Sequence, residues 1–80
     1  LSAVAEHPQM TAADLLQLAQ LALTDPDGTV RVEGAEILGR LVREAASAPG
    51  AAVQARQLLA QLQQDSDHRV VAAALNGLQA

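Results

Sequence analysis

The sequence predicts an all-α fold, and three observations support this prediction. Alanine, leucine and glutamine dominate the chain of 80 residues, and these residues favour helices. Apolar residues recur at helical spacing, whereas no stretch alternates apolar and polar residues for long enough to form a strand. Turn-forming residues interrupt the apolar pattern at 24–27, 47–50 and 65–67. We therefore expect four helices, near residues 12–23, 28–46, 51–64 and 68–79.

The first expected helix follows a capping pattern. Thr11 precedes Asp14 by three residues, so their side chains can satisfy backbone N–H groups at the start of the helix. The apolar face of this helix is expected to consist of Leu15, Leu18, Ala19 and Ala22. Three further leucines widen that face: Leu16, Leu21 and Leu23. We therefore expect this helix to be covered from more than one side.

The stretch 25–41 combines a sharp turn with the start of the second helix. Asp25 and Pro26 end the first helix, because proline cannot continue a helix and restricts the residue before it. Asp27 is a suitable N-cap, since its carboxylate can accept backbone N–H groups of the next turn. The helix that follows has one face of apolar or small residues: Val30, Gly34, Ile37, Leu38, Leu41 and Ala45.

The outer face of the second helix is charged, and we expect it to be solvated. It carries Glu33, Glu36, Arg40, Arg43 and Glu44. Glu36 and Arg40 stand four residues apart with the acid first, which is the better orientation for an ion pair.

The second half of the chain follows the same scheme. The third helix is expected to bury Val53, Leu58, Leu59 and Leu62. A turn and cap then follow at Asp65, Ser66 and Asp67. The fourth helix is expected to bury Val70, Val71, Ala74, Leu75 and Leu78. Close packing between helices is expected at Gly34, Gly39 and Gly77.

The two halves are related by a shift of 40 residues without a gap, which places Asp25 on Asp65 and Asp27 on Asp67. The same shift aligns Ala12 with Ala52, Gln17 with Gln57, Leu18 with Leu58, Val30 with Val70 and Leu38 with Leu78. A period near 40 with two helices in each unit is the spacing of HEAT and armadillo arrays. Because one helix pair cannot bury both of its faces, stacked pairs are needed to form a continuous core.

The residues resemble those of HEAT repeats, in particular the short bacterial repeats related to phycobilin-lyase HEAT domains. The first half carries the resemblance in Asp25, Val30-Arg31, Gly34-Ala35 and Leu38-Gly39-Arg40-Leu41. The resemblance implies one domain, residues 1–80, built as a right-handed α-solenoid of two HEAT-like hairpins, with units at about 10–48 and 49–80. Residues 1–9 are then a tail or the end of a preceding helix, and we expect the chain to belong to a longer array.

The resemblance also implies a ladder in which the turn aspartate of one repeat meets an arginine of its neighbour. Asp25 and Arg31 fit this pattern. In the second half, however, Val70-Val71 stands where Val-Arg is expected, and the arginine is at Arg69 instead. Asp65 is therefore expected to lack its partner.

Composition argues against several classes of function. The net charge is −4, and the five basic residues are all arginines spread among nine acids, whereas a nucleic-acid-binding protein usually shows a basic patch. The absence of aromatic residues removes base-stacking platforms, and the absence of cysteine removes disulfides and thiolate metal sites. No apolar run is long enough to cross a membrane.

No arrangement typical of catalysis or metal binding is found. His7 and His68 lack the spacing of a metal-binding pair, and the EF-hand pattern is absent. We interpret the acidic pairs and Arg31 as turn, cap and ladder residues: Asp25, Asp27, Asp65 and Asp67. We expect no metal, no cofactor and no enzymatic activity.

The sequence thus favours a non-enzymatic module for protein–protein interaction or scaffolding. HEAT-like arrays commonly present the second helices of their pairs on a concave surface, which implies a protein-binding surface of Glu33, Glu36, Arg40, Arg43, Glu44, Arg69 and Asn76. Self-association through exposed repeat ends is a further expectation. Two alternatives stay open: a nucleic-acid-binding HEAT module, and an accessory subunit of a HEAT-type lyase or hydroxylase.

Overall fold

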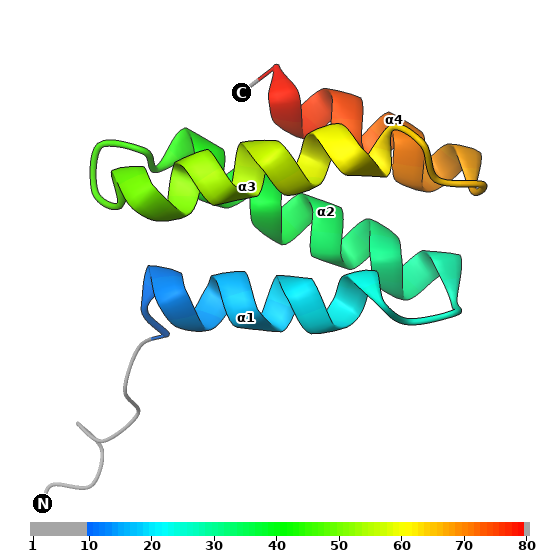
Figure 1. Ribbon diagram of the computed structural model, residues 1–80, viewed down its shortest axis with the longest axis horizontal. Coiled ribbons are helices and arrows are strands. Elements are labelled where there is room, and N and C mark those ends of the chain that lie inside the picture. Colours follow the sequence, from blue (N-terminus) through cyan, green and yellow to red (C-terminus); the bar gives the residue numbers. More distant parts are fainter. Residues whose placement is uncertain (1–9, 80) are drawn as a thin grey trace, which may run out of the picture.

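The computed structural model describes residues 10–79 and contains four α-helices (Figure 1). They are α1 (Ala12–Leu23), α2 (Gly28–Arg43), α3 (Pro49–Leu62) and α4 (His68–Leu78). No strand occurs in this part of the chain, so the all-α prediction is confirmed. Residues 1–9, for which the sequence predicts a tail or the end of a preceding helix, and Ala80 lie outside the described residues.

Local side chains fix the start of three helices. Thr11 and Asp14 form the expected capping box, with both hydrogen bonds at 3.1 Å. Asp27 accepts the backbone N–H of Thr29 at 2.9 Å, and Asp67 accepts that of Arg69 at 2.8 Å. The predicted caps of α1, α2 and α4 are therefore confirmed.

The connection between α2 and α3 differs from the prediction. The helix α2 ends at Arg43 rather than near residue 46, and Glu44 at its C-terminus has already left helical geometry with φ −100° and ψ 28°. The helix α3 begins at Pro49 rather than at residue 51. Proline is favourable at the first position of a helix, because the N–H that it lacks has no partner within the helix there.

The helices form two antiparallel hairpins, α1–α2 and α3–α4. The turns inside the hairpins lie at one end of the molecule, and the connection between the hairpins lies at the opposite end (Figure 1). The helix α2 is central, because it packs against α1, α3 and α4. The largest fully buried side chains come from α2, α3 and α4: Leu38, Leu41, Leu59 and Val70.

The core departs from the predicted apolar faces in α3 and α4. Val53 is 56% exposed and Leu75 is 45% exposed, so the prediction that both are buried is wrong. The face of α3 that packs inward uses Ala52 and Ala55 together with the predicted Leu59 and Leu62. Helical spacing showed that these helices have apolar residues on several sides, but only the packing of the hairpins decides which side is covered.

The helix α1 is covered less than predicted. Leu16 and Ala19 are buried, whereas Leu18 is 43% exposed and Leu21 is 71% exposed. The helix packs against α2 and, less extensively, against α3. Its outer side therefore remains open, contrary to the expectation of cover from more than one side.

Candidate protein-binding surface

A shallow groove of about 270 Å³ lies between α2 and α4. Its floor consists of small residues, two from each helix: Ala35, Gly39, Ala73 and Gly77. Its polar side chains are Glu36 and Arg43 from α2 and Asn76 from α4, and all three are exposed. Three of the seven residues that the sequence predicts for a binding surface therefore meet around one groove.

The glycines bring α2 and α4 close together. A Cβ atom on Gly39 would lie 3.1 Å from the Cα atom of Gly77, which is tighter than most Cβ contacts. Close packing at these two glycines agrees with the sequence-based expectation. The signal for the groove itself is a small residue at i and i+4 on both helices, and sequence reasoning did not use it. Arg43 extends toward this floor, with Nη1 3.8 Å from the position of the same Cβ atom.

The charges in the groove are available to a partner. Glu36 and Arg43 are seven residues apart on α2, which separates them by roughly 10 Å along the helix axis. Neither of them takes part in an ion pair within residues 10–79. The groove therefore presents one negative and one positive group with the amide of Asn76 on the facing helix.

The remaining residues that were predicted for the second helix lie outside the groove. Glu33, Arg40 and Glu44 are exposed but do not line it. Arg40 pairs with Glu44 at 3.5 Å, so the predicted pair of Glu36 with Arg40 is wrong. Glu36 lies one turn before Arg40 and Glu44 lies one turn after it. The pair that forms, Arg40 with Glu44, is exposed and therefore stabilises the chain little.

Arg69 also lies away from the groove, where the first turns of α2 and α4 meet. Its Nη2 is 2.8 Å from Oδ2 of Asp67, and its Nη1 donates to Oγ1 of Thr29 at 3.2 Å. The hydrogen bonds from the Arg69 side chain and its backbone N–H lower the pKa of Asp67 to about 2. Arg69 therefore links the two hairpins, a role that sequence reasoning did not assign to it.

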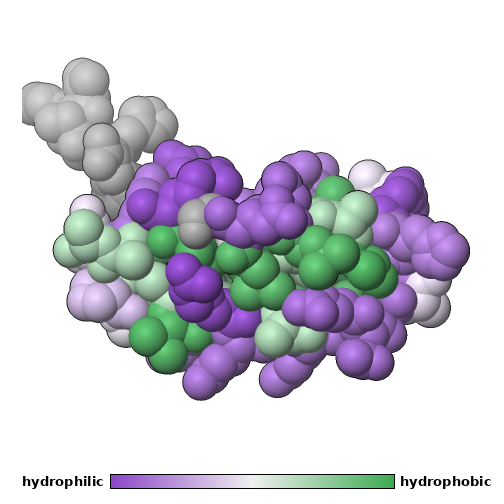
Figure 2. All heavy atoms as spheres, turned by 90° about the horizontal axis from the view of Figure 1, so that it is seen from above, coloured by the Kyte–Doolittle hydropathy of each residue, from purple (hydrophilic) through white to green (hydrophobic). Residues whose placement is uncertain are grey.

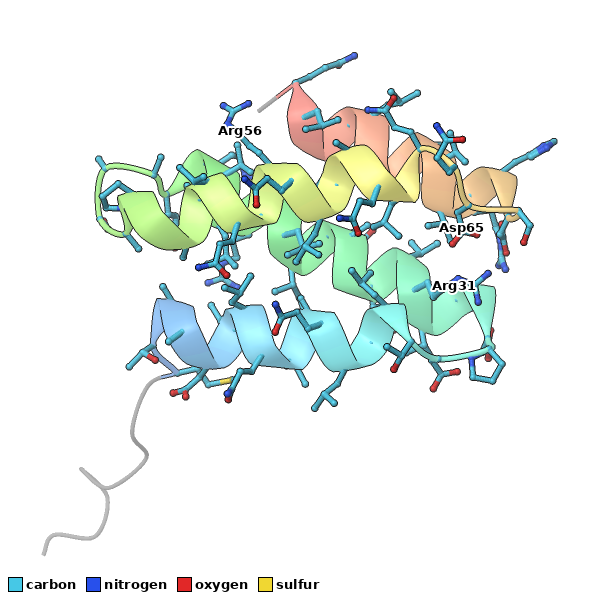
Figure 3. All side chains as sticks on the ribbon, in the orientation of Figure 1. Arg31, Arg56 and Asp65 are labelled. Atoms are coloured by element: carbon cyan, nitrogen blue, oxygen red, sulfur yellow. The ribbon has the colours of Figure 1, made fainter. Side chains whose placement is uncertain are left out.

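Arg31 and Asp65 form the main polar link between the hairpins. Nε and Nη2 of Arg31 donate to the carboxylate of Asp65 at 2.9 and 3.1 Å, and the two side chains point toward each other at the end of the molecule that holds both turns (Figure 3). Nη1 of Arg31 donates to the carbonyl groups of Asp25 and Pro26 at 2.8 and 3.0 Å. The expectation that Asp65 lacks its partner is therefore wrong, because the partner comes from the preceding hairpin.

The four turn aspartates accept hydrogen bonds from nearby backbone N–H groups and so stabilise the two turns and the helix starts. Oδ1 of Asp25 accepts the N–H of Asp27, and Oδ1 of Asp65 accepts the N–H of Asp67, both at 2.8 Å. The two turns thus repeat the same hydrogen bonds 40 residues apart. This confirms the turn and cap roles predicted for the acidic pairs.

Within the described part of the chain, no group of three or more histidine, cysteine, aspartate or glutamate side chains is placed to hold a metal ion. His68 is exposed at the start of α4, and His7 lies outside the described residues. Over the same range, none of the helices has the length and apolar character needed to cross a membrane.

Comparisons with protein-family models, with curated proteins and with solved structures find no match to this chain. The functional interpretation therefore depends on the residues and contacts described above.

Proposed function

We propose that this chain is a non-enzymatic protein-recognition module, built from two HEAT-like hairpins of a right-handed α-solenoid that continues in a longer array. The repeat of 40 residues supports the solenoid, because it recurs in the turn hydrogen bonds and in the N-caps. The bidentate pair of Arg31 with Asp65 adds a side-chain contact between successive hairpins. In this arrangement, α2 and α4 are the second helices of their pairs and form the recognition surface.

The groove between α2 and α4 is the observation that carries the proposal. Its small floor lets a partner approach the helix backbones, and Glu36, Arg43 and Asn76 offer charge and hydrogen bonds at its edges. Such a surface suits recognition of a polypeptide with complementary charges. The net charge of −4 weighs against the nucleic-acid-binding alternative, because phosphate binding needs several basic contacts on one face.

The test begins with a photo-crosslinking residue at Asn76, in the groove, or at Gln54, on the exposed side of α3. Proteins captured from an extract of the source organism only at Asn76 are then purified and titrated against the chain. We expect the double variant Glu36→Gln with Arg43→Gln to weaken this binding at least about tenfold, as for loss of two charged contacts.

The matched control is the double variant Glu33→Gln with Arg40→Gln, which removes one charge of each sign from the same helix outside the groove. We expect it to bind like the unmodified chain. Equal binding by both double variants would show that the groove is not the binding surface. Tight, salt-sensitive binding of duplex DNA in the same titration would instead favour the nucleic-acid alternative.

A further inference from the structure

We propose that the groove between α2 and α4 binds an amphipathic helix of the partner protein, which runs antiparallel to α2 and presents an acid, then a large apolar residue, then a base. This inference rests on the proposed function, because it names the partner of the same groove. Glu36 and Arg43 have no ion-pair partner within residues 10–79, so both charges are free to bind such a helix.

The spacing of Glu36 and Arg43 fits a helix and does not fit an extended segment. The two residues are seven positions apart on α2, or roughly 10 Å along its axis. A helical partner repeats this spacing between its residues i and i+7, which lie on one face. In an extended segment, roughly 10 Å corresponds to three residues, so the two side chains at its ends point to opposite sides. A helix can therefore meet both charges from one face.

The floor between the two charges accepts an apolar side chain. Gly39 lies four residues before Arg43, and a Cβ atom on it would lie 3.1 Å from the Cα atom of Gly77. Because neither glycine has a side chain, a side chain of the partner can approach both helix backbones there. The groove volume of about 270 Å³ is below the roughly 300–1,000 Å³ of small-molecule pockets, so the groove suits a side chain better than a small molecule.

The direction of the bound helix follows from the direction of α2 and α4. Both run from the end that holds the turns to the end that holds the connection between the hairpins (Figure 1). Their dipoles favour a third helix that runs the opposite way. In that direction, an acid at position i of the partner meets Arg43, residue i+4 lies over Gly39, and a base at i+7 meets Glu36. This order also stabilises the partner helix itself, since acids favour its first turn and bases its last turn.

Four synthetic peptides of about 20 residues, rich in alanine and glutamine and long enough to be helical alone, serve as probes. The forward peptide carries glutamate at i, leucine at i+4 and lysine at i+7. The exchanged peptide swaps only the glutamate and the lysine, whereas the reversed peptide has the whole forward sequence in the opposite order and fits a parallel helix. The proline peptide is the forward peptide with one proline on the side away from the groove, which breaks the helix.

The dissociation constants come from the shifts of the backbone amides of Gly39 and Gly77 in NMR titrations. We expect the forward peptide to bind at least about fivefold more tightly than the exchanged and proline peptides, and at least about threefold more tightly than the reversed peptide. The chain variant Glu36→Arg with Arg43→Glu keeps the net charge and should prefer the exchanged peptide to the forward one.

Equal or tighter binding of any of the other three peptides to the unmodified chain would overturn the proposal, and so would binding of none of the four. Glu36 and Arg43 are exposed, and circular dichroism checks that the charge-exchanged chain is folded. If it is unfolded, Glu36→Gln with Arg43→Gln replaces it and should bind the forward and exchanged peptides equally; a remaining preference for the forward peptide would contradict the assigned charge contacts.

This inference and the proposed function fail in different ways. Captured proteins whose binding needs Glu36 and Arg43, together with no binding of the forward peptide, would overturn only the helical partner. Captured proteins that bind the Glu36→Gln with Arg43→Gln variant as tightly as the unmodified chain would instead overturn recognition by the groove.

Discussion

At the scale of single residues, Arg31 makes the main polar contact between the two hairpins. Its guanidinium holds the carboxylate of Asp65 and two carbonyl groups of its own turn, so one side chain ties together both turns. The pair is largely shielded, with the side chains 15% and 11% exposed. Its hydrogen bonds raise the pKa of Arg31 and lower the pKa of Asp65.

The lowered pKa values predict loss of stability in acid. The hydrogen bond from Arg31 lowers the pKa of Asp65, and that from Arg69 lowers the pKa of Asp67 to about 2, from an ordinary value of 3.8. A carboxylate with a lower pKa in the folded state binds fewer protons there, so its contribution is complete above the unfolded pKa and is lost as the pH falls toward the folded pKa. We expect the unfolding free energy from urea titrations to fall between about pH 4 and pH 2.

The variant Asp65→Asn tests the source of this pH dependence. It leaves the half-buried Arg31 without a charged partner, so it should be less stable than the unmodified chain at pH 6. The difference between the two chains should narrow at pH 2.5, where protonation weakens the same pair in the unmodified chain. A difference that stays constant between these pH values would show that the pair does not set the acid sensitivity.

The roles of Asp27 and Leu38 predict that replacing each by alanine lowers the stability by a different amount. Replacing Asp27 by alanine removes the hydrogen bond to the N–H of Thr29 and should cost about 1 kcal/mol, as for loss of an N-cap. Replacing the fully buried Leu38 by alanine should cost about 2–5 kcal/mol, as for a truncation in a packed core. Thermal melts followed by circular dichroism compare the two. A larger loss for Asp27→Ala would mean that the cap and the core are wrongly assigned.

At the scale of helices, the parts that could be predicted are those decided by neighbours in sequence. The caps of α1, α2 and α4 depend on side chains within three residues, and they were predicted correctly. The exposure of Val53 and Leu75 and the pairing of Asp65 depend on how the hairpins pack, and these predictions were wrong. Three groove residues were selected only because the resemblance implies that the second helices face one side. That these three residues line one groove with small residues of both helices could not be predicted from either helix alone.

The surroundings of Gly77 and Gly50 predict opposite effects of their replacement by alanine on stability. A Cβ atom on Gly77 would lie 2.9 Å from Cδ1 of the buried Leu59 on α3 and 3.2 Å from the Cα atom of Gly39 on α2, whereas a Cβ atom on Gly50 would meet nothing within 4 Å. Gly50→Ala should therefore stabilise the chain by about 0.4–1 kcal/mol, because alanine favours the helix and restricts the unfolded chain. Gly77→Ala should instead lower the free energy of unfolding by about 1–3 kcal/mol, because the added methyl group overpacks the core.

Urea titrations of the two glycine variants provide the measurement, and each variant is the control for the other, since both exchange glycine for alanine within a helix. An equal gain in stability from both would show that Gly77 is not closely packed against Leu59 and Gly39.

At the scale of the whole molecule, apolar residues remain uncovered at both ends of the hairpin pair. Leu18 and Leu21 are exposed on α1, and Val53 and Leu75 are exposed on α3 and α4. Seen from the side farthest from α1, an apolar band runs across the molecule between polar borders (Figure 2). Exposed apolar patches of this kind favour association with other surfaces. In the solenoid proposed above, two hairpins are also fewer than the roughly three that usually give a stable repeat array.

These uncovered ends predict that the isolated chain self-associates or is only marginally stable. Because the large exposed residues at these ends are apolar, the contact should be apolar, so the association should persist when salt is raised from low to physiological concentration. Leu21→Gln should weaken it, since Leu21 is 71% exposed and glutamine occupies the equivalent position, Gln61, on α3. The same substitution should leave the stability of the monomer within about 0.5 kcal/mol, as for a surface change. Sedimentation velocity over a concentration series measures the association, and urea unfolding at low concentration measures the stability. A chain that stays monomeric throughout this series and also unfolds with the stability of an ordinary domain would contradict the prediction, because its ends would then need no cover.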